Sequence, residues 1–74
     1  MKKKIAPRWV LMEILDLLSD GVNIYSWEDT CDYLQRQNRF TMLDWIRDYR
    51  QLYTYSVMSK QFEKVDFYYG REEW

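Results

Sequence analysis

Apolar residues recur three or four positions apart in the first quarter of the chain, which is the spacing of one face of an α-helix. They are Val10, Leu11, Ile14, Leu15 and Leu18. Pro7 suits the first turn of this helix, because the N–H that proline lacks would have no partner there. Gly21, after Asp20, predicts the end, since glycine readily takes the left-handed conformation that closes many helices. The pattern therefore predicts a well-buried first helix that begins at Pro7 and ends at Asp20.

Two later stretches begin with residues that cap helices. Residues 26–29, Ser-Trp-Glu-Asp, resemble a capping box with Asp in place of the usual Glu or Gln, and they predict a second helix. Residues 41–44, Thr-Met-Leu-Asp, form a second box of the same kind. This box predicts a third helix over residues 41–52, separated from the second by a short turn.

After the third helix the pattern changes from helical spacing to alternation. Residues 53–57 and 65–69 alternate as strands do, and the polar residues 58–61 between them suit a turn. Residues 22–25 also alternate and predict one short strand. The alternative for the C-terminal part is that the third helix runs on to Lys60. The expected fold is α+β, with three helices, a short strand and a C-terminal β-hairpin.

This order of elements resembles the winged helix-turn-helix family, over about residues 7–69 and by element order alone. In that family the third helix and the hairpin, called the wing, contact DNA. The resemblance implies that residues 41–52 and the wing at residues 53–69 would meet DNA. The chain departs from the family in its turn, which has no glycine. It departs also on the outward face of the third helix, where Asp44 and Asp48 oppose phosphates.

The length and composition fit one small domain without covalent or metal support. Seventy-four residues lie near the lower limit for a single hydrophobic core. We expect a basic N-terminal extension over residues 1–6, a globular domain over 7–69 and a charged, aromatic tail over 70–74. Cys31 is the only cysteine and there is no histidine, so an internal disulfide is excluded and a zinc site lacks ligands. No cofactor is expected.

Neither a membrane nor an export pathway is indicated. No apolar run approaches the roughly 20 residues that a membrane helix needs. The stretch from Trp9 to Leu18 holds two carboxylates, which excludes the apolar core of a signal peptide. A free cysteine without an export signal fits a reducing cytoplasm, that of the host if the gene is phage-encoded.

The net charge of −1 hides a dipolar distribution. Residues 1–8 carry four positive charges, residues 9–35 carry six negative charges, and residues 36–51 have a balance of +2. Three carboxylates share one side of the first helix, and no Lys or Arg lies one helical turn away to neutralise them. They are Glu13, Asp16 and Asp20. Such a face either serves solubility or docks a basic partner.

Catalytic chemistry is not indicated. Without histidine, and with Cys31 on the predicted inner face of a helix, the usual pairs of nucleophile and base are missing. The carboxylate pairs Glu28/Asp32 and Asp44/Asp48 are one turn apart, but such pairs are far more often solvated charge than acid–base or metal sites. No glycine-rich phosphate loop is present. We expect that the chain is not an enzyme.

The aromatic end of the chain favours a binding role. Alternation cannot turn Phe67, Tyr68 and Tyr69 all toward one small core, so we expect exposed aromatic rings of the kind that dominate interfaces. In style the profile is similar to phage-encoded inhibitors of host machinery, anti-CRISPR proteins among them. The first hypothesis is a small interaction module that docks on a larger protein and modulates or inhibits it. Its expected contact residues are Leu43, Arg47, Arg50, Tyr68 and Trp74.

Other hypotheses stay open. An exposed aromatic edge would also serve homodimerisation, which would help so short a chain. The family resemblance implies a winged helix-turn-helix DNA-binding protein, a repressor or an excision-type factor, in which Arg47 and Gln51 read bases while other cations hold phosphates. Its expected nucleic-acid contacts are Arg36, Arg39, Arg47, Arg50, Gln51, Lys60 and Lys64.

Overall fold

The computed structural model describes residues 5–70, and the regular structure in this part of the chain is helical. The elements in order are α1 (Arg8–Ser19), α2 (Trp27–Arg36), α3 (Phe40–Asp48), α4 (Arg50–Met58), the 3₁₀-helix η1 (Gln61–Lys64) and α5 (Val65–Tyr69). No strand occurs among the described residues, so the expected α+β fold is wrong. Most of the expected N-terminal extension and C-terminal tail lies outside the described residues.

The first helix ends as its sequence predicts. Its buried residues follow the helical spacing: Val10, Leu11, Ile14 and Leu17. Gly21 takes the left-handed conformation, with φ of 83°. Its N–H donates to the carbonyl of Leu18, and the N–H of Val22 donates to that of Leu17, both at 3.0 Å. This pair of bonds is the Schellman motif, which satisfies the last carbonyls of a helix.

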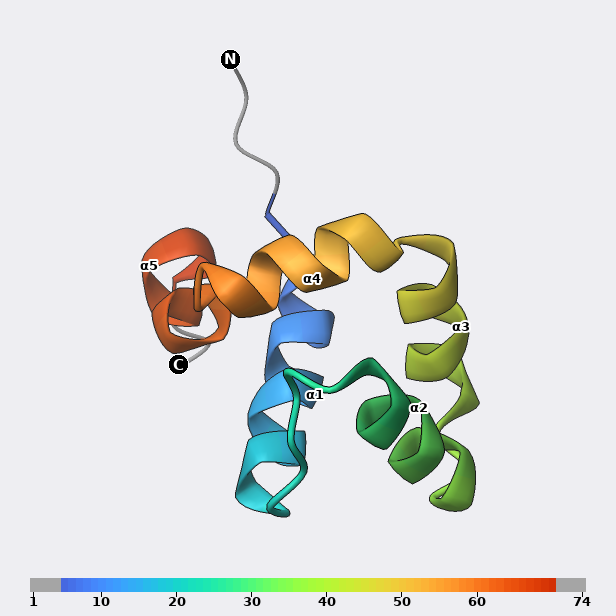
Figure 1. The fold of residues 1–74 in the computed structure, drawn as a ribbon. Helices are drawn as coiled ribbons and strands as arrows, with labels where there is room; N and C mark the ends of the chain where they lie inside the picture. Colours follow the sequence, from blue (N-terminus) through green and yellow to red (C-terminus); the bar gives the residue numbers. More distant parts are fainter. Residues whose placement is uncertain (1–4, 71–74) are drawn as a thin grey trace.

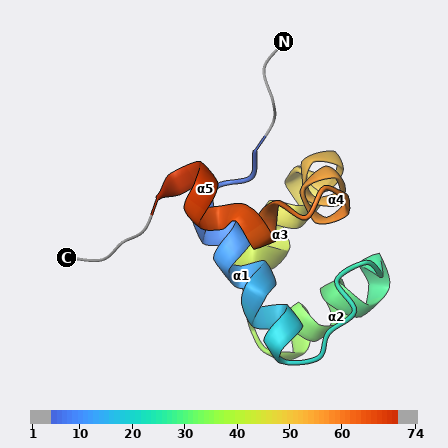
Figure 2. The ribbon, with the colours of Figure 1, turned by 90° about the vertical axis from the view of Figure 1, so that its left-hand side faces the viewer.

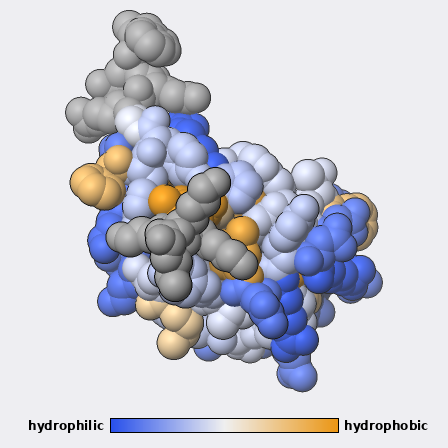
Figure 3. All heavy atoms as spheres, turned by 90° about the horizontal axis from the view of Figure 1, so that it is seen from above, coloured by the Kyte–Doolittle hydropathy of each residue, from blue (hydrophilic) through white to orange (hydrophobic). Residues whose placement is uncertain are grey.

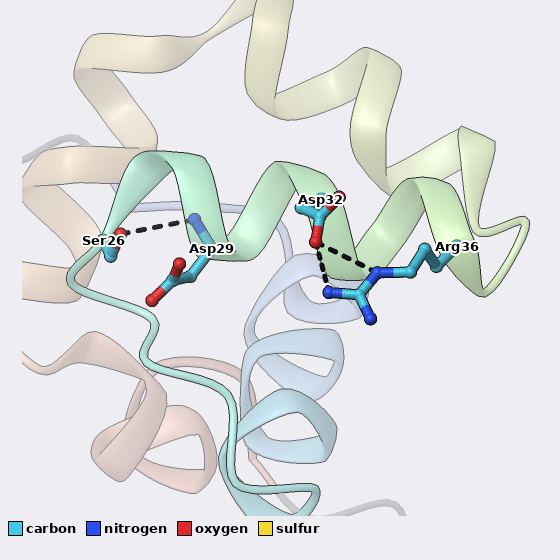
Figure 4. A network of polar contacts seen from close by, with 4 residues as sticks. All are labelled: Ser26, Asp29, Asp32 and Arg36. Carbon is cyan, nitrogen blue, oxygen red and sulfur yellow. Dashed lines mark hydrogen bonds and ion pairs between the residues drawn. The ribbon is translucent and has the colours of Figure 1, made fainter.

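Ser26 caps α2 as predicted, although only half of the capping box forms. Its side-chain oxygen accepts a hydrogen bond from the backbone N–H of Asp29 at 3.3 Å (Figure 4). The N–H of Ser26 donates to the carbonyl of Asn23 instead of an Asp29 carboxylate oxygen. Residues 22–25 therefore form a turn and not the expected short strand. At the other end of α2, Asn38 takes the left-handed conformation in place of glycine, with φ of 58°.

The predicted third helix is divided into two helices. α3 begins at Phe40, one residue before Thr41, so the second capping box does not form. The chain bends at Tyr49, whose φ of −123° and ψ of 47° are not helical. A straight helix over residues 40–58 would be about 28 Å long, nearly the 33 Å extent of the described molecule. The bend instead lets α3 pack on α2 while α4 packs on η1.

The expected β-hairpin over residues 53–69 is also wrong, because this segment forms the rest of α4, η1 and α5. The alternative of a helix that continues to Lys60 is closer to the structure, although α4 is a new helix and not an extension of α3. Alternation of aromatic residues suggested a strand that buries every second ring. In α5, however, Val65 is buried whereas Phe67 is 82% exposed.

α1 is central in the arrangement (Figure 1). α4 crosses near the N-terminal end of α1, with α2 and α3 to one side and α5 to the other. In Figure 2, α2 and α4 lie on the same side of α1. The buried apolar residues come from all six elements and from the segments between them: Ala6, Val10, Leu11, Ile14, Leu17, Ile24, Leu34, Met42, Leu43, Ile46, Tyr53, Val57, Phe62 and Val65.

Two hydrogen bonds tie distant segments together. The backbone N–H of Ala6 donates to Oε1 of Gln61 at 3.0 Å, and the Tyr69 hydroxyl donates to the Ala6 carbonyl at 2.5 Å. Gln61 is only 2% exposed, so its bond with Ala6 lies in the core. The start of the described chain is thus fastened to its last elements. Among the described residues, no helix combines the length and apolar character that crossing a membrane requires.

Candidate protein-binding surface

The outward side of α4 carries large side chains that the core does not use. The core takes up the other side of this helix, with Tyr53, Ser56 and Val57. The exposed residues are Arg50, Gln51, Thr54, Tyr55 and Met58. Tyr55 is 49% exposed and Met58 is 67% exposed. Since α4 contains no carboxylate, this face combines apolar area with positive charge.

A hollow of about 70 Å³ lies between α4 and the chain around the start of α2. Its lining residues are Ile24, Tyr25, Trp27, Arg50, Tyr53, Thr54, Val57 and Met58. The lining includes apolar core residues, because Ile24, Tyr53 and Val57 are each at most 3% exposed. Tyr25, which is 56% exposed, and Met58 extend this apolar lining toward the surface. The Tyr53 hydroxyl donates to the Ile24 carbonyl at 2.9 Å and so holds the loop against α4.

Arg50 is positioned at this hollow by an aromatic ring. Its guanidinium carbon lies 4.4 Å from the centroid of the Trp27 ring, a cation–π contact that fixes the charge without neutralising it. Within the described residues, neither Arg50 nor Arg47 forms an ion pair. Partial burial raises the pKa of the Cys31 thiol, and the nearby charges of Arg47 and Arg50 oppose this shift.

Two further hollows adjoin the first. One, of about 510 Å³, lies at the bend between α3 and α4, and the other, of about 600 Å³, lies along α4. Arg50 borders all three hollows. Seen from above, where α4 lies, the surface outside the grey residues is mostly hydrophilic or intermediate, with hydrophobic residues in separate patches (Figure 3). We use the name α4 surface for Tyr25, Trp27, Arg50, Gln51, Thr54, Tyr55 and Met58.

The structure brings only part of the expected protein-binding set to one place. Arg50 belongs to the α4 surface, and Arg47 lines the hollow at the adjoining bend. Leu43, in contrast, is 2% exposed and belongs to the core, so it offers no contact area. Tyr68 is half-buried on α5, where its ring forms a T-shaped pair with that of Phe67, and it does not line these hollows. Trp74 lies outside the described residues.

Arg36 and Arg39, two of the expected nucleic-acid contacts, form ion pairs with carboxylates. Arg36 pairs with Asp32 one turn earlier on α2 (Figure 4). Arg39 reaches α1, where its Nη1 lies 3.3 Å from Oε1 of Glu13 and its Nη2 lies 3.7 Å from Oδ2 of Asp16. The acidic side of the first helix is therefore partly neutralised by a residue far away in the sequence.

The remaining cations of that set do not form a wing. Lys60 lies in the turn after α4, and Lys64 is the last residue of η1. Gln51 and Arg50 lie in the first turn of α4, whereas Arg47 lies in the last turn of α3. The expected recognition helix, which would have presented Arg47 and Gln51 together, is interrupted at Tyr49.

Three residues of the α4 surface were not predicted from the sequence: Tyr25, Trp27 and Met58. Tyr25 was read as part of a strand, Trp27 as part of the box that begins the second helix, and Met58 as part of a turn. A helical reading of residues 50–58 would have found Met58, because it shares one face with Gln51 and Tyr55 at a spacing of four and three residues. Nothing in the local sequence places Tyr25 and Trp27 beside that face.

No family model, no curated protein and no solved structure matches this chain. In the described part of the chain, no group of three or more Cys, Asp or Glu residues is arranged to hold a metal ion. Function is therefore inferred from the geometry and chemistry of the α4 surface.

Proposed function

We propose that the protein is a non-enzymatic interaction module that docks on a larger protein through the α4 surface and modulates or inhibits that protein. The observation that supports this proposal is the exposed, unneutralised Arg50 beside Trp27, at a hollow bordered by Tyr25 and Met58. Trp, Tyr and Arg are the residue types that dominate the binding energy of protein interfaces.

The apolar area at this surface favours an interface. Met58 is 67% exposed, and covering its side chain would contribute on the order of 1–2 kcal/mol. Methionine is flexible and polarizable, so it fits partners of irregular shape. Tyr25 and Tyr55 add aromatic area with few rotatable bonds, which lowers the entropy lost on binding.

Part of the surface is also held in place by contacts within the chain. The bond from Tyr53 to Ile24 fastens the loop, Ser26 caps α2, and the Trp27 ring positions Arg50. Groups that are already fixed lose little conformational freedom on association. Binding through such a surface therefore costs less conformational entropy than binding through a loop that becomes ordered only on its partner.

The test is affinity capture with the purified protein, wild type against Met58→Glu. The substitution places a carboxylate on the α4 surface, next to the hollow that Met58 lines. We expect a protein that the wild type retains to be lost with Met58→Glu. Met12→Glu is the matched control, because Met12 lies on α1 and is 38% exposed. It introduces the same charge away from the α4 surface and should retain the protein.

Circular dichroism and thermal unfolding would first establish that both variants are folded. Retention of the same proteins by Met58→Glu at wild-type affinity would contradict the proposal. So would binding of mixed-sequence duplex DNA that weakens steeply with salt, since that dependence reports counterion release from phosphates.

A further inference from the structure

The charged side chain that lines the hollows of the α4 surface is positive, and this indicates the chemistry of the partner. The hollow beside Trp27 and the hollow along α4 are both bordered by Arg50, and no carboxylate lines either of them. Asp48 borders the third hollow, at the bend, and makes no ion pair with Arg50 among the described residues. Arg50 is thus a positioned cation with an open side.

The first backbone N–H groups of α4 lie beside Arg50, directly after the bend at which α3 ends. Arg50 is the first residue of a nine-residue helix, and Tyr49 at its N-cap position makes no side-chain capping bond. Peptide dipoles give the start of a helix a partial positive charge, which favours an anionic group close to it. A carboxylate near Arg50 would therefore interact both with the guanidinium and with the start of α4.

The lining of the hollow beside Arg50 is mixed, with apolar core residues next to Arg50, Tyr25 and Thr54. One water occupies about 10–15 Å³ of such space, so a hollow of about 70 Å³ has room for a few heavy atoms, as in an aliphatic side chain. Ile24 and Val57 in its lining are in the core and offer no hydrogen-bonding side chain. Arg50 and Met58, at the two ends of α4, are separated by about 12 Å along the helix axis.

We infer that the partner binds with an acidic amphipathic segment, in which an aliphatic side chain enters the hollow between α4 and Trp27 while a carboxylate pairs with Arg50. This inference rests on the proposed function, since it names the chemistry of the segment that the α4 surface receives. The aliphatic residue and the acidic residue of the segment lie within about four positions of each other, which is one turn of a helix. Charge-assisted pairing with the Arg50 guanidinium makes such a segment specific.

The experiment is selection of a random dodecapeptide library displayed on phage against the immobilised wild-type protein. A subtraction step on Met58→Glu removes peptides that bind elsewhere. We expect the remaining peptides to share Asp or Glu within four positions of Leu, Ile or Met. Fluorescence anisotropy of the synthetic peptides should show affinity that falls about tenfold or more with Arg50→Gln, the usual range for one charge-assisted bond.

Two further variants test whether the affinity depends on the charge of Arg50 and on its position in the α4 surface. Arg50→Lys keeps the charge and should retain more of the affinity than Arg50→Gln. Arg36→Gln removes an arginine that lies outside the α4 surface and already pairs with Asp32, so it should leave affinity unchanged. Affinity for the peptides should also fall as sodium chloride is raised.

The possible failures are distinguishable. Peptides that depend on Met58 but lack acidic residues, or that bind Arg50→Gln as tightly as the wild type, would overturn the acidic-segment inference and leave the proposed function intact. If no selected peptide binds Met58→Glu more weakly than the wild type, both the acidic-segment inference and the proposed function are overturned. Binding of a duplex oligonucleotide that Arg50→Gln abolishes, without selection of acidic peptides, would assign Arg50 to phosphate contact and overturn the inference.

Discussion

Replacing Tyr53 with Phe tests whether the loop before α2 is held to α4 by one buried hydroxyl. That hydroxyl lies 2.9 Å from the Ile24 carbonyl oxygen and 3.4 Å from Oγ1 of Thr30. Tyr53, Ile24 and Thr30 are each at most 3% exposed. The phenyl ring of the variant fills the same space, so the substitution removes the hydrogen bonds and leaves the packing in place.

The expected loss of stability follows from the group that is left without a partner. A typical hydrogen bond contributes about 1 kcal/mol net, but a buried acceptor without a donor loses about 1–3 kcal/mol. We expect Tyr53→Phe to lower the free energy of unfolding by about 2 kcal/mol. For a domain of this size, that corresponds to a Tm lower by about 8–16 °C. Urea unfolding followed by circular dichroism and differential scanning calorimetry would measure both quantities.

The pH dependence of the same variant provides a second test. Burial is the main reason that the pKa of Tyr53 is raised above its ordinary value of 10.0. The folded state therefore binds this proton more tightly than the unfolded state does. The resulting stability is complete below about pH 10 and is lost as the pH rises from there through the folded-state pKa. The difference in stability between wild type and Tyr53→Phe should shrink over that range.

Two results would refute this reasoning. A loss below about 0.5 kcal/mol would mean that water or another donor satisfies the Ile24 carbonyl in the variant. A stability difference that stays constant from about pH 8 to pH 11 would mean that Tyr53 ionises equally easily in both states.

Further predictions concern separate contacts. Arg39→Gln should lower the free energy of unfolding by about 1 kcal/mol, because it leaves the solvent-shielded Oε1 of Glu13 without its cation. Arg36→Gln should have almost no effect, and urea unfolding of the two variants would compare their stabilities. Lys60→Gly should raise Tm by a few degrees, since Lys60 has φ of 58° and glycine relieves about 1 kcal/mol of left-handed strain; a lower Tm in calorimetry would contradict this. Gln61→Leu should lower stability by about 1–3 kcal/mol in urea unfolding, because the N–H of Ala6 loses its acceptor. Arg50→Gln should raise the pH midpoint for alkylation of Cys31 by iodoacetamide, because it removes a cation that opposes the raised thiol pKa; a lower midpoint would disprove that electrostatic contact.

The parts of the structure that sequence reasoning predicted correctly depend on neighbouring residues. The apolar spacing and the Asp20-Gly21 pair predicted α1 and its end, and Ser26 predicted the start of α2. A capping or Schellman bond joins groups three to five residues apart, so the local sequence contains both partners.

The candidate surface was predicted only in part. Arg50 was identified from its charge, and Arg47 with it, but Leu43 was placed on the outside although it is buried. The expected hairpin failed because aromatic residues suit strands and helices alike when tertiary packing decides. Whether Phe67 or Val65 turns inward depends on which other element covers α5, and α1 does so here.

The sequence by itself determined the first helix, its end at Gly21 and the capped start of the second helix, since these features follow from spacing and short-range hydrogen bonds. Only the tertiary structure decided the bend at Tyr49, the pairing of Arg39 with Glu13 and Asp16, and the meeting of Trp27 with Arg50. Each of these joins or orients residues that are distant along the chain. Their energies depend on how whole helices pack, and the local pattern of residues does not contain that information.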